Sequence, residues 1–297
     1  MKARAMQVRR LGARVRAAGG GRATTLVVVA SITVILCAMA GVAWAQDQTE
    51  QSSGGATTTA AARTGYPSLS RIHFDGDFDA GCRLMGGNGG WQRNLIGSDG
   101  PGRGAVERTR VAEGRCSARL TSIGSDGRAE LGKNKGGPDP HVIYEGLYFV
   151  PRSTSSIGNF TQHKQSEPDS EDCYNGGLKN TGGRIKLVTV GRCTDPQRRG
   201  QRRFDLGVMP RLRWFAVKVQ LRFSNNPRVG FARAWVDRDG PGPGGYRLAL
   251  RRTGVDAESG DRNGARVKFR TGTYHADRSG NNTVFVDGWH MMCVTRC

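Results

Sequence analysis

The chain contains 297 residues, of which 45 are Lys or Arg and 25 are Asp or Glu, so its formal net charge is +20. An apolar fraction of 37% is too high for a fully disordered chain, and 44 glycines are too many for a helical bundle. Because the glycines follow no collagen-like period, they indicate turns between short strands. The composition therefore favours an all-β domain, and the basic charge indicates an anionic partner.

Residues 1–45 have the pattern of a secretory signal peptide. Seven basic residues and no acid stand in residues 1–25, and an uncharged apolar run of 20 residues extends from Leu26 to Ala45. The run closes on Ala43-Trp44-Ala45, a small-x-small sequence typical of a cleavage site. A run of this length would also serve as a membrane anchor. We expect a secreted protein, and residues 46–297 carry a net charge of +13.

Residues 46–66 are rich in Ser, Thr, Ala and Gly and lack the apolar side chains of a core, so we predict a flexible linker. From residue 67 to residue 297 the pattern is uniform and shows no internal repeat. A length of about 230 residues is typical of a single β-sandwich or barrel domain. We expect this domain to be a monomer.

Short runs of alternating apolar and polar residues predict the strands of that domain. In Trp214–Phe223, every second residue from Phe215 onward is apolar, whereas Lys218 and Gln220 lie on the opposite face. Turn-forming residues separate the runs, which together predict a sandwich of two sheets. The predicted strands include Ser70–Phe74, Ala118–Ser122, Ala129–Leu131, Ile143–Val150, Ile185–Val190, Trp214–Phe223, Phe231–Val236, Arg266–Thr273 and Thr283–Met292.

Six cysteines follow the signal segment, which suggests three disulfides among 15 connectivities. The pair Cys173 and Cys193 is favoured, because it would close one long Gly-rich loop. Cys82 and Cys116 would pair with each other or with the cysteines at the C-terminus. The basic run at residues 198–203 is predicted to be a loop.

Polar side chains occur within four predicted strands, where a sheet would present them to a ligand. They are Arg128 with Glu130, Gln162 with His163, Lys218 with Gln220, and Arg270 with Tyr274. Alternation places Arg270 and Tyr274 on one face, with Gly272 between them leaving space above the sheet. Adjacent residues such as Gln162 and His163 point to opposite faces unless a bulge intervenes, and of the two we favour His163 as the ligand-facing residue.

The order of these motifs resembles that of jelly-roll polysaccharide lyases. The similarity is closest to the heparin-lyase-I-like and glucuronan-lyase-like group and more distant to jelly-roll alginate lyases. Matching segments run from HFDGDF at residues 73–78 to VFVDG at residues 284–288. The resemblance implies a concanavalin-A-like β-jelly-roll sandwich of two antiparallel sheets, with a cleft across one of them.

The resemblance also implies cleavage of a uronate-containing anionic polysaccharide by β-elimination, with no cofactor. It assigns catalytic roles to His163, Tyr274, Arg128 and Gln162, and substrate-binding roles to Glu130, Arg270, Lys164, Lys218 and Gln220. Two features depart from the pattern, since Arg270 stands where the motif usually has Lys, and alginate lyases separate the Gln and His by one residue. No specific nucleic acid is expected as a partner, and no membrane once the signal is cleaved.

Three further readings remain open. A calcium-loop start at residues 75–79 lacks the glycine and glutamate of that motif, because Ala80 and Gly86 stand at those positions; a structural calcium site elsewhere is left open. The same fold would suit a non-catalytic carbohydrate-binding module. A basic surface protein that binds any polyanion through charge alone is the third alternative.

Overall fold

The computed structural model describes residues 72–76, 78–79, 81–85, 91–98, 100–134, 141–166, 173–191, 200–224, 226–240, 245–255, 257, 266–274 and 280–294. The chain divides into two compact units, Met1–Thr64 and Gly65–Cys297, and all of these residues belong to the second unit. The predicted signal peptide and linker lie outside the described residues. Within the described ranges, no helix is long and apolar enough to cross a membrane.

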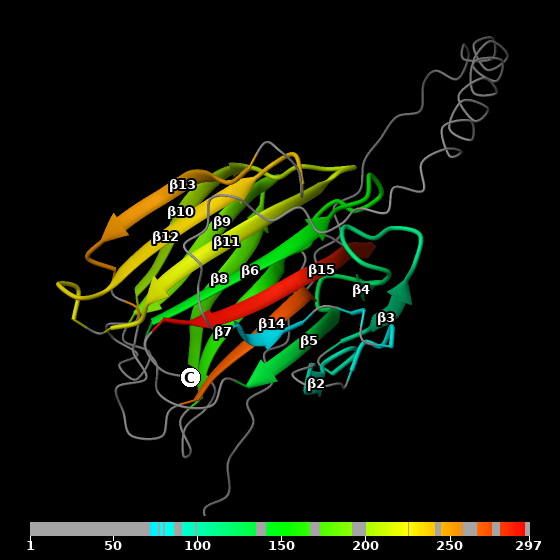
Figure 1. The fold of residues 1–297 in the computed structure, drawn as a ribbon, viewed down its shortest axis with the longest axis horizontal. Helices are drawn as coiled ribbons and strands as arrows, with labels where there is room; N and C mark the ends of the chain where they lie inside the picture. Colours follow the sequence, from blue (N-terminus) through cyan, green and yellow to red (C-terminus); the bar gives the residue numbers. More distant parts are fainter. Residues whose placement is uncertain are drawn as a thin grey trace, which may run out of the picture. The chain divides into compact units, whose positions relative to one another are not determined.

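The secondary structure elements of the described ranges are β-strands (Figure 1). In chain order they are β1 (Ile72–Asp75), β2 (Arg93–Asn94), β3 (Gly102–Glu107), β4 (Ser117–Ile123), β5 (Arg128–Asn134), β6 (His141–Phe149), β7 (Asn159–Ser166), β8 (Cys173–Thr181), β9 (Arg184–Gly191), β10 (Gly200–Val208), β11 (Trp214–Arg222), β12 (Phe231–Asp237), β13 (Arg247–Thr253), β14 (Arg266–Tyr274) and β15 (Asn281–Cys293).

These strands form two antiparallel sheets packed face to face. The eight-stranded sheet has the order β13-β12-β11-β6-β15-β4-β3, with β1 also paired to β15, and the seven-stranded sheet has the order β10-β9-β8-β7-β14-β5-β2. The chain crosses repeatedly between the sheets, so that β14 of one sheet lies in sequence between β13 and β15 of the other. The fold is therefore an all-β jelly-roll sandwich, as the sequence predicts.

The core lies between the sheets and follows the predicted alternation. On β11, Phe215, Val217, Val219 and Leu221 are fully buried. Tyr148 of β6 packs against Phe160 of β7 with ring centroids 5.0 Å apart, and its hydroxyl lies 2.8 Å from Thr161 Oγ1. Burial raises the pKa of Tyr148, so this phenol stays protonated within the core.

A disulfide joins Cys82 to Cys116, which selects one of the two predicted pairings for these cysteines. The Asp79 carboxylate accepts hydrogen bonds from the backbone nitrogens of Arg115 (2.6 Å) and Cys116 (3.0 Å) and so holds the same two segments together. A bridge over 34 residues adds about 4 kcal/mol by restricting the unfolded chain. The predicted pair Cys173–Cys193 lies outside the described side chains.

The basic run at residues 198–203 differs from its prediction as a loop. Its last four residues, from Gly200 to Arg203, form the start of β10 at one edge of the seven-stranded sheet. Charged side chains are common on edge strands, because one side of such a strand faces water and charges deter pairing with other chains. Charge density alone therefore did not distinguish an edge strand from a loop.

Candidate functional site

Arg128 and Glu130 lie on the outer face of the seven-stranded sheet. Alternation on β5 buries Ala129 and Leu131 in the core and turns the two charged side chains outward. Arg128 Nε donates a hydrogen bond of 2.8 Å to Glu130 Oε2. Arg128 is 4% exposed and Glu130 is fully buried, so this is a buried ion pair rather than a solvated surface pair.

Gln162 joins this pair from β7, although β14 lies between β7 and β5. Its Nε2 donates a hydrogen bond of 2.6 Å to Glu130 Oε1, so the two carboxylate oxygens hold Arg128 and Gln162 respectively. Glu130 thus positions two donors instead of contacting a ligand itself. Among the described residues, the buried Oε1 atom of Gln162 has no hydrogen-bond partner.

Arg270 and Tyr274 complete the arrangement from β14. Tyr274 is paired with Arg128, whose Cζ lies 4.6 Å from the centroid of the Tyr274 ring. Arg270 is paired with Gln162 and is 4% exposed, whereas Tyr274 is partly exposed. The prediction that Arg270 and Tyr274 share a face is confirmed. We call Arg128, Glu130, Gln162, Arg270 and Tyr274 the Glu130 cluster.

Gly272 is required at its position for a reason that differs from the predicted one. Its φ of +142° is rarely adopted by other residues, and a Cβ there would lie 2.1 Å from the carbonyl oxygen of Ala129. The pairing of β14 with β7 also shifts register between Thr271 and Tyr274. The glycine therefore permits a close approach of two strands at a bulge.

His163 does not belong to the cluster, so the preference for it over Gln162 is wrong. The imidazole is fully buried between the sheets, with its ring centroid 5.3 Å from Phe223 and 6.0 Å from Tyr144. The pairing of β7 with β8 shifts register between Asn159 and Thr161 and again between Gln162 and Lys164, whereas its pairing with β14 stays in register from Thr161 to Ser166. Gln162 bonds Glu130 on the outer face while His163 lies against Phe223 in the core, so the two side chains have the opposite orientations of neighbouring residues.

Lys218 and Gln220 lie on the outer face of the eight-stranded sheet, on the far side of the sandwich from the Glu130 cluster. Lys218 is paired with Glu145, and its Nζ lies 5.9 Å from the Trp235 ring centroid. Gln220 Nε2 lies 2.9 Å from Nε2 of His141. Neither residue reaches the cluster, so the prediction of one shared site is wrong for both. Lys164 belongs to β7, but its side chain lies outside the described part of the structure.

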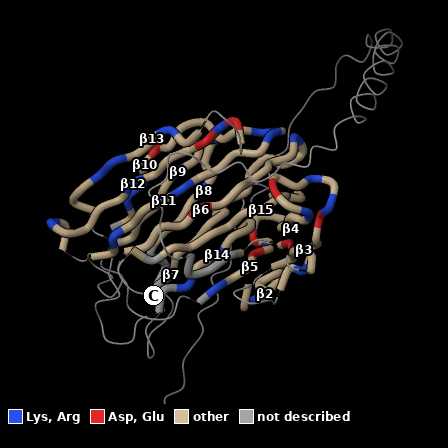
Figure 2. The backbone as a smooth tube through the Cα atoms, in the orientation of Figure 1, with Lys and Arg blue, Asp and Glu red and all other residues tan. Residues whose placement is uncertain are grey.

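The described residues form no metal centre. Figure 2 shows basic residues on strands of both sheets, with fewer acidic ones. Within the described part of the chain, no group of three or more His, Cys, Asp or Glu side chains is arranged to hold a metal ion. The carboxylate of Asp79, part of the calcium-like sequence, binds backbone nitrogens instead.

One further member of this face is Asn159, which is 9% exposed and paired with Tyr274. No local sequence signal identifies it, because its place beside Tyr274 depends on the pairing of β7 with β14. What the cluster offers chemically is a set of donors for an anion, with a phenol at its more exposed end. Its only carboxylate is occupied by two of those donors.

No protein-family model matches the sequence, and no curated protein does so either. Among solved structures, an alginate lyase from a Chlorella virus has 11% identity and a TM-score of 0.49, over 75% of this chain and all of that one. The PL-14 alginate lyase of Aplysia kurodai has 9% identity and a TM-score of 0.46, over 64% of this chain and 87% of that one. The catalytic domain of a glycoside hydrolase family 131 protein from Coprinopsis cinerea has 10% identity and a TM-score of 0.45, over 76% and 96%. Structures of lyases and of a hydrolase thus have about the same low similarity to this chain. The comparison therefore assigns no activity to the chain.

Proposed function

We propose that this protein is an exported polysaccharide lyase that cleaves a uronate-containing anionic polysaccharide by β-elimination. The observation that carries the proposal is the Glu130 cluster, in which one buried carboxylate fixes Arg128 and Gln162 beside Tyr274. The order of the sequence motifs supports the same activity. Within this activity we propose the heparin-lyase-I-like or glucuronan-lyase-like group as the nearer relatives, and export by residues 1–45.

The proposed chemistry begins with the substrate carboxylate, whose charge opposes removal of the neighbouring C5 proton. Arg128, Arg270 and the amide of Gln162 would neutralise this carboxylate and stabilise the enolate-like intermediate. Because Glu130 already holds Arg128 and Gln162, these donors need little rearrangement when charge develops.

Proton transfer is assigned to Tyr274, since His163 faces the core. A Tyr274 phenolate would take the C5 proton, the C4–O4 bond would break with its electron pair passing to O4, and the phenol would return the proton to that oxygen. The Arg128 guanidinium over the Tyr274 ring would stabilise the phenolate. The products are an unsaturated uronide and a new reducing end.

A panel of glucuronan, alginate and heparin tests the activity directly. Purified protein should release an ultraviolet-absorbing unsaturated uronide from at least one polymer, and mass spectrometry should show no added water in the summed products. Products that carry an added water would indicate a hydrolase. Absence of any product from the whole panel would contradict the lyase assignment.

A non-catalytic carbohydrate-binding module is the second candidate. The observation that favours it is burial, because Arg128, Glu130, Gln162 and Arg270 are each less than 5% exposed. In that case the cluster would stabilise the sheet, and Tyr274 would contact a sugar without transferring a proton. Such a module would bind fragments of the panel polymers and release no product.

A further inference from the structure

A line of paired residues crosses the outer face of the seven-stranded sheet, from the Glu130 cluster to the opposite edge. Each member is directly paired with the next across neighbouring strands, and such pairs share a face of the sheet. We call this line the transverse row. Across β5, β14, β7, β8, β9 and β10 its members are Arg128, Tyr274, Asn159, Lys179, Lys186 and Asp205.

The two lysines of the row point away from the core. Lys179 follows Leu178, which is fully buried, and Lys186 lies between Ile185 and Leu187, which are fully buried as well. Alternation therefore turns both lysines to the outer face, and both are partly exposed. They extend the positive charge of the Glu130 cluster over two more strands.

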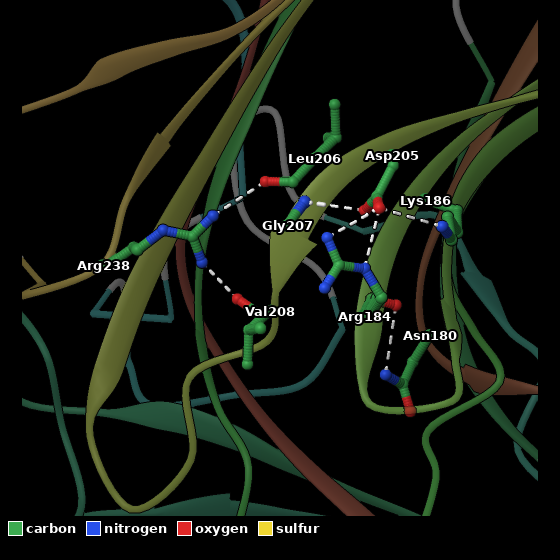
Figure 3. A network of polar contacts seen from close by, with 8 residues as sticks. All are labelled: Asn180, Arg184, Lys186, Asp205, Leu206, Gly207, Val208 and Arg238. Carbon is green, nitrogen blue, oxygen red and sulfur yellow. Dashed lines mark hydrogen bonds and ion pairs between the residues drawn. The ribbon is translucent and has the colours of Figure 1, made fainter.

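Asp205 closes the row at the sheet edge (Figure 3). Its Oδ2 accepts a hydrogen bond of 2.7 Å from Arg184 Nε and lies 3.2 Å from Lys186 Nζ. The Arg184 guanidinium holds the pKa of Asp205 well below its usual range, so this carboxylate is charged and partly neutralises Lys186. The Lys186 and Asp205 side chains are 23% and 40% exposed, so a dissolved anion can compete with Asp205 for Lys186.

The edge itself is held in place from the other sheet. Arg238, which follows β12, donates hydrogen bonds to the carbonyl oxygens of Leu206, at 2.7 Å, and Val208 at the end of β10 (Figure 3). Gly207 lies between them, and a Cβ there would meet the Arg238 side chain at 2.4 Å. Lys186 therefore stands on a strand whose outer neighbour, β10, is anchored.

The spacing of strands sets how far these cations lie from Tyr274. Neighbouring strands are about 4.8 Å apart, so Lys179 and Lys186 lie about 10 and 14 Å along the row from Tyr274. A pyranose ring with its glycosidic oxygen extends about as far as one such spacing. The two lysines thus match sugars about two and three positions away from the one at Tyr274.

We propose that an anionic polysaccharide lies across the strands along the transverse row, and that Lys179 and Lys186 bind anionic groups on sugars two and three positions from Tyr274. This inference rests on the proposed function and deepens it. Asp205 moderates the affinity by competing with the sugar for Lys186.

Binding of two-sugar and six-sugar fragments of glucuronan, alginate and heparin, measured by calorimetry, tests the proposal. The measurements use the Tyr274→Phe background, so that fragments stay intact. We expect tighter binding of the six-sugar fragment of at least one polymer. The double variant Lys179→Ala/Lys186→Ala should weaken its binding roughly tenfold and leave the two-sugar fragment unchanged.

Two further variants separate this role from a general charge effect. Arg247→Ala/Arg251→Ala removes two exposed positive charges from β13 of the other sheet and should leave binding within about twofold of the parent. Asp205→Asn should instead tighten binding of the six-sugar fragment a fewfold, because Lys186 loses its competitor.

Unchanged six-sugar binding in the lysine variant, or an equal loss in the arginine variant, would overturn the proposal. Failure of all fragments to bind would overturn it as well. If the length-dependent pattern holds while wild-type protein releases no unsaturated uronide, the transverse row is supported and the lyase activity is refuted.

Discussion

Replacing Glu130 by Gln tests whether its buried carboxylate organises the cluster. Arg128 Nε and Gln162 Nε2 donate to different oxygens of Glu130, and the glutamine side chain replaces one of these oxygens by an amide nitrogen that cannot accept. Arg128 would keep its charge at 4% exposure without its partner carboxylate. Breaking a buried ion pair in this way costs about 3–5 kcal/mol, and partial acceptance by the new amide oxygen leads us to expect a loss of about 3 kcal/mol. Urea unfolding followed by tryptophan fluorescence measures this free energy.

The control for Glu130→Gln is Asp239→Asn, which removes the same charge from an exposed ion pair. Asp239 lies 3.4 Å from Arg213, and both side chains are more than 60% exposed, so the unfolding free energy should stay within about 0.5 kcal/mol of wild type. Arg128→Met/Glu130→Leu, which removes both buried charges, should recover most of the loss. A wild-type urea midpoint for Glu130→Gln would refute the assignment of this pair as the organising contact.

Three more changes follow from the geometry. Gly272→Ala should destabilise the fold by about 2–4 kcal/mol in thermal or urea unfolding. The control is Gly182→Ala, which should cost about 1 kcal/mol because Gly182 has a positive φ but no atom within 4 Å of an added Cβ. Equal costs would contradict the close approach at the bulge. His163→Leu should keep turnover within a fewfold of wild type because the ring lies against Phe223 in the core, and a hundredfold loss in folded protein would place this histidine in the reaction after all. Burial raises the pKa of Asp287 to about 7, above its ordinary value of 3.8, so the folded state keeps a proton that the unfolded state releases. Stability should therefore fall by about 3 kcal/mol as pH rises from 4 to 7, and Asp287→Asn should flatten that profile; an identical profile in the variant would refute this cause.

The layers of the fold were predictable because burial imposes a period of two on each strand. In Trp214–Phe223, every second residue from Phe215 to Phe223 belongs to the core, and β14 presents Arg270 and Tyr274 on one face as predicted. These inferences need only the alternation of side chains along a single strand.

The membership of the site was harder to predict, since it depends on pairing between distant segments. Alternation shows that Gln162 and His163 point to opposite faces, but the contacts of the His163 ring with Tyr144 of β6 and with Phe223 decide that His163 faces inward. Lys218 sits on a polar strand face like that of Arg270, yet the two strands belong to different sheets, so their polar faces point to opposite sides of the sandwich. The order of the strands in the sequence does not show which sheet each strand joins.

Tyr274→Phe tests the central claim most directly, because it removes only the hydroxyl proposed to transfer the proton. The affinity of the variant for a polymer fragment, measured by calorimetry, should stay within about twofold of the wild-type affinity. Both measurements are made at a temperature where turnover is negligible. Its rate of release of unsaturated uronide should fall by about 10²–10⁴-fold, the range typical for loss of a general acid–base group. Retention of most of the wild-type rate by the folded variant would contradict the account.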